Sequence, residues 1–153
     1  MTLYRFEDEL IVKKPLEEVF EFFSNPGNLA EITPKKLGFT VLTPGELSLY
    51  KGLIIDYEIK LFRCIPARWS SYIMDVKQNE YFEDVQLKGP YSYWHHRHEF
   101  HEHEEGTLIK DIIHYQVPLS FIGRIANFLL VKRDIKHIFK YRREQVKTLL
   151  GTS

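Results

Sequence analysis

The sequence predicts an α+β fold, in which a curved antiparallel sheet packs against one long C-terminal helix. From Phe39 to Val117 apolar residues alternate with polar ones at a period of two, which is the pattern of β-strands. After Pro118 the apolar residues return at helical spacing and continue almost to Gly151. The chain of 153 residues is long enough for one domain, residues 1–153, with a core and an internal cavity.

The N-terminal segment predicts one strand followed by two short helices. Residues 3–12 alternate between apolar and charged side chains, which favours a strand. Pro15 suits the first turn of a helix, because its missing N–H would have no partner there. The residues at 24–27 end this helix, and a second one is expected over residues 28–32 before Pro34 closes it.

Turn residues divide the period-two region into consecutive antiparallel strands, which is the pattern of a meander. We expect breaks at Thr43–Gly45, Ile65–Pro66, Lys77–Glu80, Gly89–Pro90 and Glu104–Gly106. The strands expected between these breaks cover residues 39–42, 53–61 and 69–74, a strand from Tyr81, a strand after Gly89–Pro90, and residues 108–117.

The C-terminal helix is amphipathic, with an apolar stripe from Ile125 to Leu149. The stripe weakens at Lys132–Asp134, which predicts a separate lead-in helix from about Phe121 to Leu130. Its cationic residues are interpreted as a solvated face, with transient contact to an anionic membrane as the alternative. These residues are Arg124, Lys132, Arg133, Lys136, Lys140, Arg142, Arg143 and Lys147.

The stretch from Tyr81 to Phe100 carries aromatic and polar residues on the same strand face. A dry core would not hold such polar groups without partners, since each unpaired group costs about 1–3 kcal/mol. A solvent-facing row would rarely contain Trp and Phe. The face therefore predicts the wall of a cavity, formed by Phe82, Asp84, Gln86, Trp94, His96, His98 and Phe100.

The next strand is expected to present Ile109, Asp111, Ile113 and Tyr115 on this inner face. Asp84, His96, His98, Asp111 and Tyr115 would then form a polar cluster. One interpretation is that these groups only satisfy one another and fix the strand register. His95, His101 and His103 have the opposite parity, beside Arg97 and Glu99, and are expected on an outer solvated face.

Composition excludes several classes of function. Lys plus Arg and Asp plus Glu both number 21, so no overall charge attracts nucleic acid. Cys64 is the single cysteine and has no partner for an internal disulfide. No targeting segment opens the chain and no apolar run is long enough to span a membrane, so a cytoplasmic protein is expected.

The element order is that of the helix-grip fold, and the chain resembles the SRPBCC superfamily along nearly its whole length. This superfamily includes START lipid-transfer domains, birch-pollen-allergen-like proteins and polyketide cyclases. The residues that resemble a bacterial ligand-binding branch of it are Phe82-x-Asp84-x-Gln86-x-x-Gly89-Pro90-Tyr91-x-x-Trp94-x-His96-x-His98-x-Phe100, then Asp111-x-x-x-Tyr115-x-x-Pro118 and Ile138-Phe139-x-x-Arg142. The Gly-rich loop of the plant members is absent between Thr43 and Lys51, so their ligands are not carried over.

The resemblance implies a curved sheet gripping the long helix around an apolar cavity. The first hypothesis is a protein that binds a small hydrophobic or aromatic ligand, such as a lipid or polyketide-like metabolite, between the sheet and the C-terminal helix. The expected contacts are Trp69, Phe82, Asp84, Gln86, Trp94, His96, His98, Phe100, Asp111 and Tyr115.

Two other functions remain open from the sequence. His96, His98, Asp84 and Asp111 are candidates for acid–base chemistry in an enzyme of the polyketide cyclase or dehydratase type. The third hypothesis is an interaction module that acts through the basic helix or an edge strand. Two histidines at i and i+2 are a weak metal signal, so no metal or other cofactor is expected.

Overall fold

A computed structural model describes residues 2–45, 47–61 and 65–151, and Cys64 lies outside this part of the chain. Seven antiparallel strands form one sheet in the order β1-β7-β6-β5-β4-β3-β2. The strands are β1 (Tyr4–Val12), β2 (Thr40–Val41), β3 (Ile54–Leu61), β4 (Ile65–Lys77), β5 (Tyr81–Lys88), β6 (Tyr93–His103) and β7 (Gly106–Gln116). The helices are α1 (Leu16–Phe23), α2 (Pro26–Leu29), η1 (Lys35–Leu37), α3 (Ser120–Ala126), η2 (Asn127–Val131) and α4 (Lys132–Leu150).

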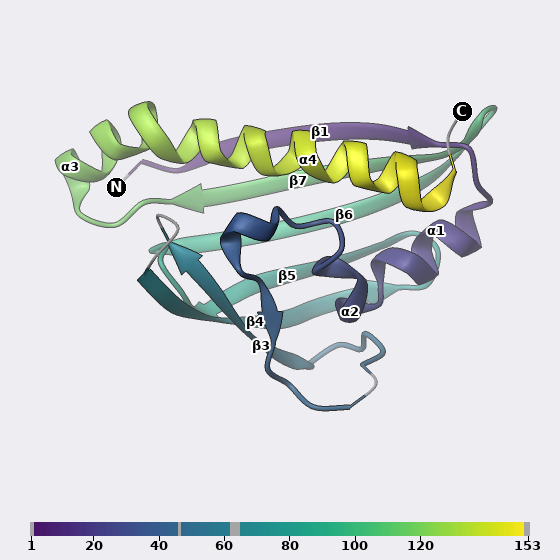
Figure 1. Cartoon of the computed structure of the whole chain (residues 1–153), viewed down its shortest axis with the longest axis horizontal. Coiled ribbons are helices and arrows are strands. Elements are labelled where there is room, and N and C mark those ends of the chain that lie inside the picture. The colour runs from purple at the N-terminus through teal and green to yellow at the C-terminus, as the bar shows by residue number, and fades with distance from the viewer. Residues whose placement is uncertain (1, 46, 62–64, 152–153) are drawn as a thin grey trace.

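The curved sheet holds α4 against one of its faces, which confirms the predicted α+β helix-grip fold. Figure 1 shows α4 lying along β1 and β7, while α1 and α2 lie across the part of the same face nearer β5. Ile135, Phe139 and Val146 are the buried apolar side chains of α4. In the described part of the chain, no helix is long and apolar enough to cross a membrane.

Two boundaries in the first half of the chain differ from the sequence prediction. The second helix begins at Pro26 rather than at residue 28, because the Asn25 side chain accepts the Gly27 N–H and caps it. The predicted break at Ile65–Pro66 is wrong, since β4 begins there and Pro66 pairs with Lys60. Proline is tolerated because the pairing of β4 with β5 starts only at Ser70.

The predicted gap between the last two helices is a π-helical turn rather than an interruption. The five residues of η2 connect α3 directly to α4. The helix therefore continues without a break through residues 132–134.

The described core has three buried apolar groups, one of which is formed mainly by β3 and β4. Under α1, Phe20 packs against Phe82 and Phe100, with ring centroids 6.2 and 5.2 Å apart. Under α4, Phe139 and Ile113 belong to a second buried group. The side chains between these regions are polar, and they form the candidate site.

The turn from β1 into α1 crosses the start of β7 at very close range. Thr107 is fully buried and its hydroxyl donates to the Lys14 carbonyl over 2.8 Å. Gly106 has a φ of 135°, and a Cβ built there would lie 2.2 Å from the Val12 carbonyl oxygen. Only glycine leaves room for this crossing of two backbones.

We predict that Gly106→Ala destabilises the protein more than Gly52→Ala. Gly52 also has a positive φ, 97°, but a Cβ there meets no described atom within 4 Å. Gly52→Ala should therefore cost only the backbone strain, about 1–2 kcal/mol. Gly106→Ala should cost at least about 2 kcal/mol more in urea unfolding, because backbone must move. Equal losses would show that the close crossing is not required.

Candidate ligand-binding site

The polar cluster lies on the inner face of β5, β6 and β7, as the strand period predicts. In the sheet register His98 pairs with Asp111 and with Phe82, and His96 pairs with Asp84. The two histidine rings stack, with centroids 3.7 Å apart. Both histidines and Asp111 are buried. The cluster is therefore built by register, from residues at alternate positions of neighbouring strands.

Asp111 is the centre of this cluster. His96 Nε2 lies 2.8 Å from Asp111 Oδ1 in a hydrogen bond. His98 Nδ1 is also 2.8 Å from this oxygen, in a close ionic contact whose angle is poor for a hydrogen bond. Nη1 of Arg142, from α4, stands 4.0 Å from the same atom. One buried carboxylate thus faces three nitrogen-bearing side chains.

The two histidines differ in charge because they differ in surroundings. Burial and the neighbouring charge of His98 lower the pKa of His96 to about 4, although Asp111 partly offsets them. Burial alone would also lower the pKa of His98, but Asp111 and Asp84 outweigh it and raise that pKa above its ordinary value. Burial would raise the pKa of Asp111, yet the two histidines hold it well below its usual range. The two carboxylates therefore favour the protonated form of His98, whereas the lowered pKa of His96 favours its neutral form.

A second line of contacts extends the cluster across the sheet. His98 Nε2 lies 3.7 Å from Asp84 Oδ2, and Asp84 Oδ1 accepts a 3.3 Å hydrogen bond from Ser71 Oγ. Ser71 in turn accepts a 3.1 Å bond from the indole N–H of Trp69. Polar contacts therefore connect β7 to β4 beneath the helices.

A cavity of about 60 Å³ opens beside this cluster, between the sheet and the α1–α2 segment. Apolar side chains make most of its wall, and polar atoms gather on the side of the cluster. Its lining is Phe22, Phe23, Pro26, Asn28, Leu29, Ile32, Leu49, Ile55, Tyr57, Ser71, Ile73, Phe82, Asp84, His98 and Arg142.

Three of the residues predicted as ligand contacts line this cavity: Phe82, Asp84 and His98. His96 and Asp111 are buried behind His98. Phe100 packs against Phe20 and Phe23 in the core under α1.

The other four predicted contacts are not among the residues that line the cavity. Trp69, Trp94 and Tyr115 pack together around Tyr91, with Trp69 and Trp94 centroids 5.2 Å apart. Gln86 exchanges two hydrogen bonds with the Tyr91 backbone, at 2.8 and 3.2 Å, and so holds the loop after β5. A ligand role for these four residues stays a prediction that the closed cavity does not support.

The sequence did not predict that residues of α1 and α2, or Tyr57, would line the cavity. It also did not predict that Arg142 would be buried. Burial, with a smaller contribution from Asp84, raises the pKa of the Tyr57 phenol, which keeps it a neutral hydrogen-bond donor. The interpretation of Arg142 as part of a solvated face is wrong, since only 9% of it is exposed. Its position was a usable signal: Ile135, Phe139, Arg142 and Val146 follow helical spacing along the buried stripe.

Asp84, His96 and His98 could each offer one ligand atom to a metal ion, because these atoms lie within 4.8 Å of one another. A cation there would compete with Asp111 for His96 Nε2, which is hydrogen-bonded to that carboxylate.

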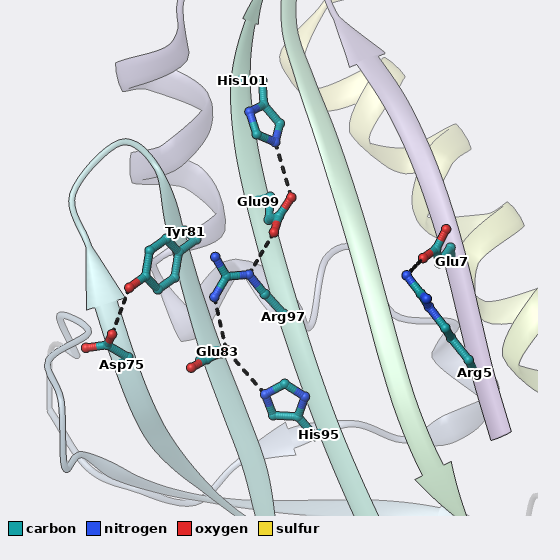
Figure 2. Close-up of polar contacts among 9 residues, drawn as sticks. All are labelled: Arg5, Glu7, Asp75, Tyr81, Glu83, His95, Arg97, Glu99 and His101. Carbon is teal, nitrogen blue, oxygen red and sulfur yellow. Dashed lines mark hydrogen bonds and ion pairs between the residues drawn. The ribbon is translucent and has the colours of Figure 1, made fainter. Parts of the chain in front are cut away.

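The opposite face of β5 and β6 carries a separate ionic network, shown in Figure 2. Arg97 contacts Glu83 at 3.2 Å and Glu99 at 2.7 Å, and Glu83 also meets His95 at 3.3 Å. His101 contacts Glu99 at 3.3 Å. The predicted outer placement of these histidines is therefore correct, although His95 is half-buried rather than fully solvated.

Comparison with solved structures finds the same fold at low sequence identity. A Chromobacterium violaceum protein has a TM-score of 0.71 and 13% identity over 97% of this chain and 99% of its own. The di-domain ARO/CYC StfQ of the steffimycin biosynthetic pathway has a TM-score of 0.73 and 12% identity, over 97% of this chain and 50% of its own. The major latex-like protein 151 of Panax ginseng has a TM-score of 0.59 and 14% identity over 88% and 96%.

Comparison with family models and with curated proteins finds no match. The structural likeness confirms the helix-grip fold that the sequence predicts. At these identities it establishes the fold alone.

We predict a distinctive pH dependence of stability caused by His96. From pH 6.5 down to about 4 the unfolded chain protonates this residue while the folded protein keeps it neutral, so stability falls with pH. Relative to His96→Gln, the natural protein should lose about 3 kcal/mol across this window in urea unfolding. His98 has the opposite sign: its contribution is complete below pH 6.5 and is lost as the pH rises through its raised pKa.

The matched control is His101→Gln, on the outer face of the same strand. Its unfolding free energy should follow the natural protein at every pH. A His96→Gln curve parallel to that of the natural protein would contradict the neutral state of His96.

Proposed function

We propose that the protein binds a small, largely apolar ligand in the cavity between the α1–α2 segment and the sheet. The observation that carries this proposal is the lining itself, in which an apolar wall faces a few polar groups from His98, Asp84 and Arg142. Binding pockets have this composition, because apolar contacts supply affinity and a few polar groups fix orientation. The fold shared with StfQ, an ARO/CYC protein of a biosynthetic pathway, supports a small-molecule site.

Binding requires the cavity to widen. Its volume of about 60 Å³ is far below the roughly 300–1,000 Å³ of pockets that hold drug-sized ligands. The α2 segment is suited to move, because its backbone hydrogen bonds are local: Asn28 to Asn25, Glu31 to Asn28 and Thr33 to Ala30. An outward shift of α2 therefore leaves the strand pairing of the sheet intact.

We predict that Ile55→Phe blocks binding, whereas Ile54→Phe does not. Ile55 lines the cavity and is 1% exposed, but its neighbour Ile54 points to the other face and is 48% exposed. Added bulk at position 55 fills the space that a ligand would use. The fluorescence of a neutral apolar probe, N-phenyl-1-naphthylamine, should report at least a tenfold weaker affinity for Ile55→Phe. Equal affinities in both variants would place the probe elsewhere.

An enzyme of the dehydratase type is a second candidate, favoured by His98. This side chain lines the cavity with Asp84 beside it, and its raised pKa favours the protonated form that a general acid needs. In the loss of water from a β-hydroxy carbonyl compound, His98 would give its proton to the departing hydroxyl while Asp84 takes the α proton. Transfer of a proton from Asp84 to His98 would then return both side chains to their starting protonation states.

We predict that, if this chemistry occurs, His98→Gln slows dehydration of a 3-hydroxyoctanoyl N-acetylcysteamine thioester at least about 100-fold. His101→Gln, on the outer face, should keep the natural rate. Mass spectrometry of the product follows the reaction, and urea unfolding confirms that both variants are folded. A folded His98→Gln protein with undiminished turnover would exclude His98 as the acid.

A further inference from the structure

Arg142 has hydrogen-bonding capacity that the described residues do not use. Its Nε and Nη1 are buried and have no hydrogen-bond partner in the described part of the chain. The nearest carboxylate oxygen, Oδ1 of Asp111, is 4.0 Å from Nη1, too far for a hydrogen bond. Leaving charged donors unpaired in a buried site is costly, so such donors indicate a partner that is yet to bind.

The cavity is the place where such a partner can bind. Arg142 is part of the cavity lining, together with the aliphatic side chains of Ile55 and Ile73. The Cζ atom lies 4.6 Å from the centroid of the Phe139 ring, which holds the guanidinium in place from the side of the helix. Because Nε and Nη1 are buried, a molecule reaches them only when the cavity widens, and it then meets both apolar atoms and N–H donors.

The charges around Arg142 favour a neutral acceptor over an anion. Two carboxylates, Asp84 and Asp111, already stand in the cluster beside Arg142 and His98. The guanidinium therefore already has negative charge close to it. A ligand carboxylate would add further negative charge to a buried site, whereas a carbonyl oxygen accepts a hydrogen bond without adding charge.

We infer that the ligand carries a neutral carbonyl oxygen, which accepts a hydrogen bond from Arg142 while its apolar body lies against Ile55 and Ile73. This inference rests on the proposed function and specifies the chemistry of its ligand. Arg142 is thus a specificity-determining residue, and the apolar wall contributes affinity without distinguishing one oxygen group from another.

The test compares three probes that share a benzene ring and are of similar size. Acetophenone carries a neutral carbonyl, benzoate carries a carboxylate, and ethylbenzene has no oxygen. Their affinities are measured by displacement of N-phenyl-1-naphthylamine and by ¹H–¹⁵N spectra that follow the Arg142 Nε–H signal. The natural protein should bind acetophenone about 10-fold more tightly than ethylbenzene, and the Nε–H signal should shift only with acetophenone.

Two variants distinguish the loss of the Arg142 side chain from the loss of a positive charge in general. Arg142→Met should bring the ratio of acetophenone to ethylbenzene affinity close to one and leave ethylbenzene binding at least as tight. Arg143→Met removes the neighbouring cation, which pairs with Asp8 instead, and should keep the natural ratio. If Arg142→Met does not fold, the Nε–H signal of the natural protein still decides.

Each outcome is decisive. Equal binding of acetophenone and ethylbenzene, or an Nε–H signal that does not move, overturns the role of Arg142 but leaves the apolar site standing. Tighter binding of benzoate than of acetophenone overturns the neutral character of the ligand. Failure of all probes, the fluorescent one included, contradicts the proposed function itself.

Discussion

The buried charge of Asp111 is the interaction on which the interior depends. A carboxylate at this depth is tolerated only with partners, since removing one partner of such a pair leaves an uncompensated charge at a cost of about 3–5 kcal/mol. Its partners come from two strands and one helix: His96 and His98 from β6 and Arg142 from α4. The register of β6 on β7 and the docking of α4 are therefore coupled through one oxygen atom. A shift of either element would leave Asp111 with too few donors.

This coupling divides the inner face of the sheet into two halves with different properties. Under α4, Tyr115, Trp94 and Tyr91 fill the space with mutually packed rings. Under α1 and α2 the wall is aliphatic, and the cavity remains open. The charged cluster separates the halves. The fixed half can thus keep the polar groups in place while the other half changes shape around a ligand.

The sequence predicted correctly which strand residues share the inner face of the sheet, because the strand period alone determines this. Alternation placed His96, His98 and Asp111 on one face, and the register confirms that His98 stands opposite Asp111. Alternation does not show which helix covers each part of that face. Gln86 and Trp94 were therefore predicted to line the cavity, although the cavity lies on another part of the same face. Arg142 was missed because a long cationic side chain on an amphipathic helix usually extends to solvent, although helical spacing places it on the buried stripe. Helical spacing does not reveal its contact with Asp111, 31 positions earlier in the sequence.

The ion pairs of the cluster are compatible with the apolar ligand that we propose. Asp84, His98 and Asp111 already contact one another, so a ligand gains little by replacing these contacts and loses much by breaking them. Arg142 is different, because its free donors gain a partner when a suitable oxygen arrives. In the proposed function, selectivity therefore depends on Arg142, and affinity depends on the apolar side chains that line the cavity.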